Sequence, residues 1–269
     1  MDEEVSARDV VVHSIRTRID EEGDGLPLVL VHGLGGPQMW ERIIEPLSQN
    51  FHVVSVHLPG FGESDCPPSP FTTDEYADFL CNLLDTLNIQ STSIVGISYG
   101  GQIAATFSCR HPKVVDKLVL IASTGLKDYG ILRKRFIWKI IAGGAKHLVL
   151  KSEWLTCLFG RRSFYNSANR PNDLCRKFHE QIMRDGKTGA WLNALWNVVS
   201  EENEFRQQLK SLQMPTLILW GKDDRILPPR YADELHRMIP NSTVTLLDEC
   251  GHSVPLEKVE KVCNALLDS

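Results

Sequence analysis

Short apolar runs alternate with amphipathic segments along most of the chain. Runs rich in β-branched side chains and bounded by turn residues predict buried strands at residues 28–32, 52–56, 92–97, 117–122, 216–220 and 243–247. Between them, helical spacing of apolar positions predicts helices near residues 38–48, 74–88, 99–110, 228–239 and 254–267. Residues 9–19 alternate with period two and predict an antiparallel edge hairpin. The pattern predicts an α/β fold: a mostly parallel sheet of about eight strands with helices on both faces.

The alternation is interrupted once, between Thr124 and Phe205. No strand pattern recurs there, and the stretches with helical character are residues 132–143, 175–183 and 191–199. About eighty residues are too many for a simple connection inside a compact domain. We therefore predict a core domain formed by residues 1–123 and 206–269, with a helical cap, or lid, of residues 124–205 inserted between two strands.

Composition narrows the class of protein. The chain has 269 residues, of which 42% are hydrophobic and 23% charged, as is usual for a soluble globular protein. The net charge of −5 gives no reason to expect a nucleic-acid partner, and no apolar run is long enough to cross a membrane. The acidic N-terminus does not resemble a secretory signal, and the seven cysteines are scattered without a C-x-x-C pair. We expect a cytoplasmic protein without a metal site, and leave its oligomeric state open.

Charge is unevenly distributed. Residues 124–190 hold 14 Lys or Arg and 5 Asp or Glu, a net charge of +9. Two interpretations remain open. The predicted cap could simply have a solvated basic surface, or it could form a positive rim that steers an anionic substrate toward the site beneath it.

The stretch GISYGG, from Gly96 to Gly101, contains one reactive side chain, the hydroxyl of Ser98. It follows a predicted strand and opens a predicted helix, which is the context in which G-x-S-x-G indicates a nucleophile. The glycines at positions 96 and 100 permit a sharp turn that would expose Ser98 at its apex. Taken alone, the serine could equally be a helix N-cap.

A second glycine-rich turn, HGLGGPQMW, follows the first of the predicted parallel strands. Its glycines would free backbone N–H groups to point above the sheet. We therefore predict an oxyanion hole formed by the N–H groups of Leu34 and Tyr99. His32 precedes this turn, and we interpret it as structural because another histidine is better placed.

That histidine is His252, in a turn after the last predicted strand, and Asp223 and Asp224 follow the strand before it. A serine hydroxyl becomes a nucleophile when an imidazole takes its proton, and a carboxylate must orient that imidazole. The chain order serine, aspartate, histidine is typical of an α/β-hydrolase. These residues predict a catalytic triad, with either aspartate as the acid.

Together these motifs resemble the α/β-hydrolase superfamily, in its serine esterase, C–C hydrolase and haloperoxidase-like branch, over nearly the whole chain. The similar segments are HGLGGPQMW, LPGFGES, GISYGG, WGKDDRILP and CGHSVPLE. The resemblance implies that the acid is Asp224, which lies three residues after Gly221 and four before Pro228. One position departs from the family pattern, because His57 stands where an aspartate usually precedes LPG; this removes a familiar loop anchor.

Serine at position 98 argues against the dehalogenase and epoxide hydrolase branches, which use aspartate there. We predict hydrolysis of a small-molecule carboxylic ester through an acyl-enzyme, with no cofactor. The alternatives are a C–C hydrolase of the meta-cleavage type, an acyl-CoA thioesterase, and a hydrolase-fold protein that only binds a ligand. Ile97, Tyr99 and Ser253 differ from the residues usual in C–C hydrolases. The predicted pocket-lining residues, which could equally be cap core, are Trp138, Trp154, Trp191 and Trp196.

Overall fold

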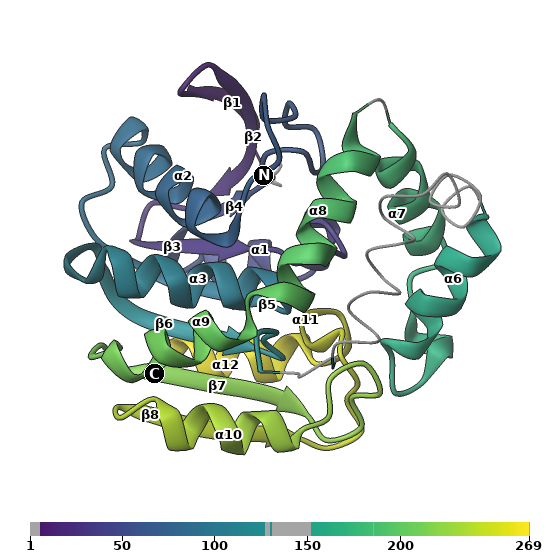
Figure 1. The fold of residues 1–269 in the computed structure, drawn as a ribbon. Helices are drawn as coiled ribbons and strands as arrows, with labels where there is room; N and C mark the ends of the chain where they lie inside the picture. The colour runs from purple at the N-terminus through teal and green to yellow at the C-terminus, as the bar shows by residue number, and fades with distance from the viewer. Residues whose placement is uncertain (1–5, 127–129, 131–151, 185, 269) are drawn as a thin grey trace.

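The central strands carry apolar side chains on both of their faces. In the computed structural model, which describes residues 6–126, 130, 152–184 and 186–268, Leu28 and Leu30 of β3 (Leu26–Val31) belong to one core cluster. Val29 and Val31, which point the other way, belong to a second. A parallel sheet covered by helices on both sides requires this pattern. The predicted α/β fold is confirmed (Figure 1).

The sheet has eight strands in the order β1-β2-β4-β3-β5-β6-β7-β8. Only the β1–β2 and β2–β4 pairs are antiparallel, and all other neighbours run parallel. The predicted hairpin is present, and His13 and Ser14 form its two-residue turn with positive φ angles of 46° and 67°. The remaining strands are β1 (Ser6–Val12), β2 (Ile15–Glu22), β4 (Phe51–Val56), β5 (Thr92–Ile97), β6 (Val115–Ile121), β7 (Thr216–Gly221) and β8 (Ser242–Leu247).

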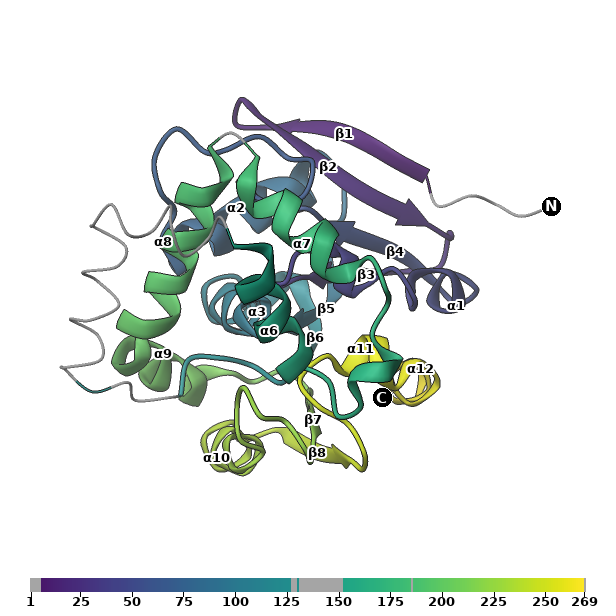
Figure 2. The ribbon, with the colours of Figure 1, turned by 90° about the vertical axis from the view of Figure 1, so that its right-hand side faces the viewer.

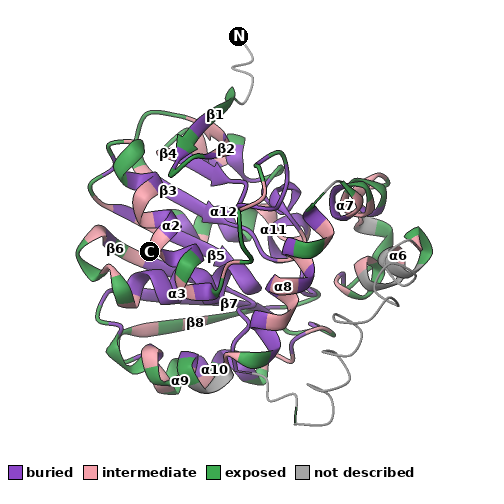
Figure 3. Cartoon of the chain, turned by 45° about the horizontal axis from the view of Figure 1, so that its top comes forward, coloured by how far each residue is buried: buried purple, intermediate pink, exposed green. Residues whose placement is uncertain are grey.

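Helices from distant parts of the chain cover the two faces. The cluster that contains Val29 and Val31 also takes side chains from α2 (Thr73–Thr86), α3 (Tyr99–Arg110) and α10 (Arg230–Met238). The opposite cluster takes them from α1 (Ile44–Ser48), α11 (Val254–Glu257) and α12 (Val259–Leu267). Figure 3 shows the resulting layers, with buried central strands between helices that are exposed on their outer sides.

Three predicted elements differ in the structure. The helix expected at residues 38–48 is a short 3₁₀ turn, Pro37–Met39, followed by α1. The helix expected at residues 254–267 is divided at Lys258, whose φ of −134° and ψ of 52° are not helical. The strand expected at residues 243–247 is not buried, because β8 pairs only with β7 at the sheet edge and leaves Thr243, Thr245 and Leu246 exposed.

Between β6 and β7 the structure describes α6 (Glu153–Arg162), α7 (Leu174–Met183), α8 (Lys187–Ser200) and α9 (Glu202–Gln208), here called the insertion helices. Viewed toward the carboxyl ends of the strands, α6, α7 and α8 lie in front of the sheet (Figure 2). The helix expected at residues 132–143 lies outside the described residues. The predicted boundary at residue 205 falls inside α9, which contacts α3 of the core. In the part of the chain that the structure describes, no helix is sufficiently long and apolar to span a bilayer.

Candidate active site

Ser98 lies at the turn between β5 and α3, with φ 55° and ψ −120°. A positive φ is costly for any residue with a side chain, and such strain is held in place by its surroundings. Here the Ser98 N–H donates to Ile121 O at 2.9 Å, and the Ser98 carbonyl accepts from the N–H groups of Gly101 and Thr124, each at 3.0 Å. These backbone bonds fix the turn, so the Ser98 side chain is left at the partly exposed apex.

The glycines around Ser98 provide space. A Cβ at Gly96 would lie 2.2 Å from the carbonyl oxygen of Gly100, and one at Gly100 would lie 2.1 Å from that of Val31. Neither glycine has a positive φ; among the residues of this turn the strained angle belongs to Ser98 itself. The glycines therefore allow α3 to begin directly against β3 and β5.

The predicted oxyanion residues lie beside this turn. A Cβ placed on Gly33 would be 2.9 Å from Ser98 Cβ and 3.1 Å from Tyr99 N, so the two glycine-rich turns are in direct contact. The Tyr99 N–H is in the first turn of α3, where a backbone N–H has no acceptor within its helix. Leu34 follows Gly33 in a turn closed by the Gly36 N–H donating to Gly33 O at 3.1 Å. The turn that carries Leu34 thus lies against Ser98 and Tyr99.

Asp224 and His252 are brought together. The His252 Nδ1–H donates to Asp224 Oδ2 at 2.7 Å, and the Asp224 side chain has no exposed surface. The other carboxylate oxygen, Oδ1, accepts from the N–H groups of Ile226 at 2.7 Å and Leu227 at 2.8 Å. These backbone bonds orient the carboxylate, which in turn orients the imidazole and leaves Nε2 as the ring nitrogen that can accept a proton.

Ser98, Asp224 and His252 follow β5, β7 and β8, so all three lie at the carboxyl edge of the sheet. Within the described residues, no hydrogen bond joins the His252 imidazole to the Ser98 hydroxyl. Such bonds are often long in enzymes without substrate. Asp223 is half-buried beside Asp224, and its backbone N–H donates to Cys250 O at 2.9 Å. The carboxylate paired with His252 is therefore that of Asp224, the one that the resemblance indicated.

His32 is fully buried and has both ring nitrogens engaged by backbone groups. Its Nδ1–H donates to Gly33 O at 2.7 Å, and its Nε2 accepts from the Leu58 N–H at 3.1 Å. Burial lowers the pKa of His32 from 6.5 to about 3. The ring is therefore neutral and serves to join the turn after β3 to the turn after β4.

This histidine is expected to make the protein sensitive to acid. Because the unfolded chain binds a proton at His32 below pH 6.5 and the folded one only near pH 3, stability present above pH 6.5 is lost progressively across that window. We expect the difference in unfolding free energy between wild type and His32→Gln to shrink by about 1.4 kcal/mol per pH unit. Urea unfolding from pH 7.5 to 5 measures it. A parallel slope in both proteins would contradict the prediction, and His13→Asn, at an exposed histidine, is the control.

His57 holds the loop after β4, at the position where the family usually has an aspartate as loop anchor. Its anchoring role was not predicted from the sequence. Its Nε2–H donates to Asp20 Oδ2 at 2.9 Å, and its Nδ1 accepts from the Glu63 N–H at 3.0 Å. A side chain at Gly62 would overlap this ring, since a Cβ there would lie 2.3 Å from His57 Nδ1. The histidine therefore ties the loop after β4 to β2.

The four tryptophans predicted to line a pocket have different environments. Trp138 lies outside the described residues, and Trp154 is 69% exposed, which does not fit an enclosed pocket. Trp196 is half-buried on α8. Trp191, on the same helix, packs edge-on against Phe178 and donates its indole N–H to Leu34 O at 3.0 Å. This bond to the candidate oxyanion turn was not foreseen, because no local pattern links residues so far apart.

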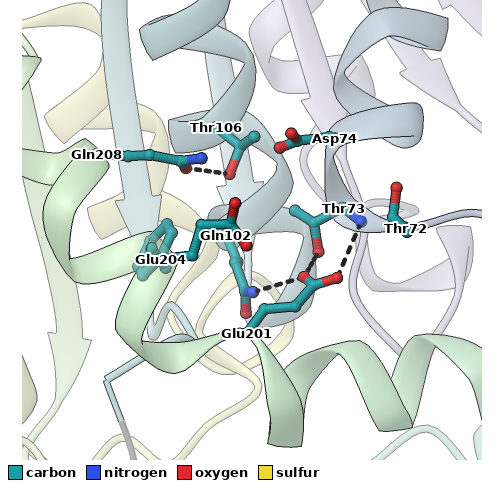
Figure 4. A pocket seen from close by; sticks show the side chains of 9 residues that line it. Thr72, Thr73, Asp74, Gln102, Thr106, Glu201, Glu204 and Gln208 are labelled. Atoms are coloured by element: carbon teal, nitrogen blue, oxygen red, sulfur yellow. Dashed lines mark hydrogen bonds between the residues drawn. The ribbon is translucent and has the colours of Figure 1, made fainter.

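A cavity of about 230 Å³ lies between α2, α3 and α9 (Figure 4). Glu201 is partly buried in its wall, where it accepts a hydrogen bond from the Thr73 hydroxyl, and burial raises the pKa of the Glu201 carboxyl. Gln102, which also lines the cavity, accepts a hydrogen bond from the Thr124 hydroxyl at 2.9 Å. The Thr124 N–H in turn donates to the Ser98 carbonyl. Ser98, Asp224 and His252 are not among the lining residues, which are Thr72, Thr73, Asp74, Gln102, Thr106, Glu201, Glu204, Phe205 and Gln208.

A mostly parallel sheet in this order, with a histidine–aspartate pair at the carboxyl ends of its strands and a strained serine after β5, defines the class of α/β hydrolases. The sequence model of the α/β hydrolase fold matches residues 27–259. The chain therefore belongs to this family.

Proteins similar to this chain are named for different activities. The chain is 26% identical over 268 residues to 2-hydroxymuconate semialdehyde hydrolase of Pseudomonas putida, a match that covers 94% of this chain and 90% of that one. A putative lipase of Acinetobacter baumannii superposes with a TM-score of 0.85 at 24% identity, over 98% of this chain and 90% of the other. A meta-cleavage product hydrolase of Pseudomonas fluorescens has a TM-score of 0.81 at 21% identity, covering 98% and 97%. These structural likenesses confirm the fold.

Proposed function

We propose that the protein is a serine hydrolase that cleaves a small-molecule carboxylic ester through an acyl-enzyme on Ser98. The observation that carries the proposal is the 2.7 Å hydrogen bond from His252 to the buried Asp224, at the sheet edge that also holds Ser98. The Asp224 carboxylate is shielded from solvent and is oriented by its own hydrogen bonds. It can therefore stabilise an imidazole that must become positively charged during the reaction. Other histidines of the chain also pair with carboxylates, as His57 does with Asp20, but His252 does so at the sheet edge that holds Ser98.

In the proposed reaction, His252 Nε2 takes the proton of the Ser98 hydroxyl as Oγ attacks the ester carbonyl carbon. The Leu34 and Tyr99 N–H groups donate to the oxyanion of the tetrahedral intermediate. As the C–O bond to the alcohol breaks, the alcohol oxygen takes the proton from His252. Water then loses a proton to His252 and attacks the acyl carbon, and Ser98 Oγ departs with that proton. The products are a carboxylic acid and an alcohol, and Asp224 stabilises the imidazolium in both halves.

C–C bond hydrolysis is a second candidate, because relatives that include 2-hydroxymuconate semialdehyde hydrolase are named for it. Two of the positions that differ from C–C hydrolases are occupied by residues turned into the protein. Ile97 is 2% exposed in the core, and Ser253 is 2% exposed with its hydroxyl donating to Ser163 Oγ at 3.1 Å. The identities of these residues, which differ from those usual in C–C hydrolases, favour an ester substrate. Of the basic stretch that motivates the thioesterase alternative, residues 131–151 lie outside the described residues.

A substrate panel tests the proposal. Purified protein is assayed with p-nitrophenyl esters of increasing acyl length, a 2-hydroxy-6-oxo-dienoate and an acyl-CoA, and kcat/KM is compared. We expect the highest value for an ester, and rapid quenching should trap an acyl group on the peptide that contains Ser98. A dienoate turned over faster than every ester would replace the proposal with C–C hydrolysis. Ligand binding without any turnover would leave a binding protein.

We further propose that the insertion helices form the cap of this site and hold its oxyanion turn. The supporting contact is the Trp191 indole N–H on Leu34 O at 3.0 Å. Trp191→Phe keeps an aromatic ring but removes this donor, so the Leu34 peptide loses a constraint. We expect kcat to fall about tenfold with little change in KM, since removing an oxyanion donor outright costs about 10²- to 10³-fold. Steady-state kinetics measures it. Trp154→Phe, at the exposed tryptophan, is the matched control, and equal kcat in both variants would refute the role.

A further inference from the structure

The loop that carries His252 packs against the segment Ser163–Tyr165, which follows α6. The carbonyl of Ser163, one residue after α6, accepts from the His252 N–H at 2.7 Å and from the Ser253 N–H at 2.9 Å. The two segments are so close that a Cβ at Gly251 would lie 2.6 Å from Ser163 O and 2.8 Å from Tyr165 N. The backbone position of His252 therefore depends on residues about ninety positions away in the chain.

Glu257 joins these two segments with one carboxylate. Its Oε1 accepts from the Gly251 N–H at 2.9 Å, and its Oε2 accepts from the Tyr165 N–H at 2.7 Å. Glu257 ends α11, directly after the histidine loop, and is half-buried. Burial raises the pKa of this carboxyl, while the two N–H donors act in the opposite direction. Glu257 thus closes the histidine loop on itself and attaches it to the Ser163–Tyr165 segment.

The middle residue of that segment, Phe164, adds an apolar contact between the two segments. Phe164 is 1% exposed and belongs to the same core cluster as Cys250 and Val254, which flank the histidine loop. The Ser253 hydroxyl adds a bond to Ser163 Oγ at 3.1 Å. A shift of the histidine loop would therefore have to break backbone, side-chain and apolar contacts, and the Glu257 carboxylate supplies two of the hydrogen bonds among them.

We infer that Glu257 is a positioning residue for the proposed reaction: by accepting from Gly251 and Tyr165 it fixes the histidine loop and so aims His252 at Ser98. The expected effect of Glu257 on kcat rests on the proposed function, whereas its effect on the position of His252 does not. Only a carboxylate offers an acceptor oxygen to each N–H donor. The amide of Glu257→Gln keeps one acceptor and presents an NH₂ group to the other donor, so the bridge opens at nearly unchanged volume.

The test compares Glu257→Gln with Glu260→Gln, which alters an exposed glutamate three positions further along. The first readout is the downfield proton NMR resonance of the His252 Nδ1–H bonded to Asp224, assigned by its absence in His252→Gln. We expect it to shift or broaden in Glu257→Gln and to stay unchanged in Glu260→Gln. The second readout is kinetic: kcat should fall about 10- to 100-fold in Glu257→Gln with KM within about twofold, because misplacing a catalytic group by a fraction of an ångström acts on the reaction step.

A lowered melting temperature with an unchanged resonance and unchanged kcat would overturn the inference, since Glu257 would then only stabilise the fold. If Glu257→Gln does not fold, Glu257→Asp takes its place, because the shorter side chain keeps the charge but cannot reach both the Gly251 and the Tyr165 N–H. An unaltered resonance and kcat in that variant would count against the inference. Should wild type turn over no substrate at all, the proposed function fails, while the resonance still decides whether Glu257 positions His252.

Discussion

Replacing Ser98 with alanine is expected to reduce kcat for the preferred ester by about 10⁶-fold, to a level set by binding and the oxyanion hole alone. The reason is that His252 would have no hydroxyl to deprotonate and no acyl-enzyme could form. The bonds that hold the turn use only the backbone of Ser98, through Ile121, Gly101 and Thr124, so alanine should leave the turn intact. The positive φ of 55° is about equally unfavourable for serine and alanine.

A matched serine separates loss of the nucleophile from general damage. Ser123 lies just beyond the end of β6, the strand beside β5, is 2% exposed, and donates its hydroxyl to Thr124 O at 3.1 Å. Ser123→Ala should keep most of the activity, and both variants should unfold near the wild-type temperature. Hydrolysis that survives in Ser98→Ala after removal of contaminating esterases would show that the reaction uses another group.

The fold could be predicted from the sequence wherever a local pattern decides burial. Strands β3 to β7 are apolar on both faces, and the turns after β3 and β5 are marked by glycines that the close packing requires. The edge strand β8 was predicted as buried because its composition is equally β-branched; only its position beside a single neighbour, β7, leaves Thr243 and Thr245 exposed. Strand order is a long-range property that composition does not carry.

The candidate site shows the same division. Ser98, Asp224 and His252 could be placed at strand ends from sequence, since chemistry and chain order restrict the choice. The residues that hold them could not. Trp191 reaches Leu34, and Glu257 reaches Tyr165, across long separations and without a periodic signal. A glutamate at the end of a helix and a tryptophan on another are ordinary in a sequence, and become informative only when their partners are known.

Asp224→Asn is expected to lower kcat by about 10⁴-fold while leaving the fold and KM nearly unchanged. The asparagine oxygen can still accept from the Ile226 and Leu227 N–H groups that now bond to Asp224 Oδ1. The NH₂ group then faces His252 Nδ1, which must become an acceptor. The proton moves to Nε2, the nitrogen that has to take the Ser98 proton, so the imidazole is held in the unproductive tautomer.

Asp223→Asn is the matched control, because it makes the same chemical change one residue earlier. The Asp223 backbone N–H is held by Cys250 O, and neither this contact nor the packing of Asp224 depends on the Asp223 charge. We expect Asp223→Asn to retain kcat within a few-fold. Steady-state kinetics on the same ester decides between the two carboxylates. A large loss in Asp223→Asn with activity preserved in Asp224→Asn would mean that the 2.7 Å bond to His252 serves the fold and that the reaction draws on the neighbouring carboxylate.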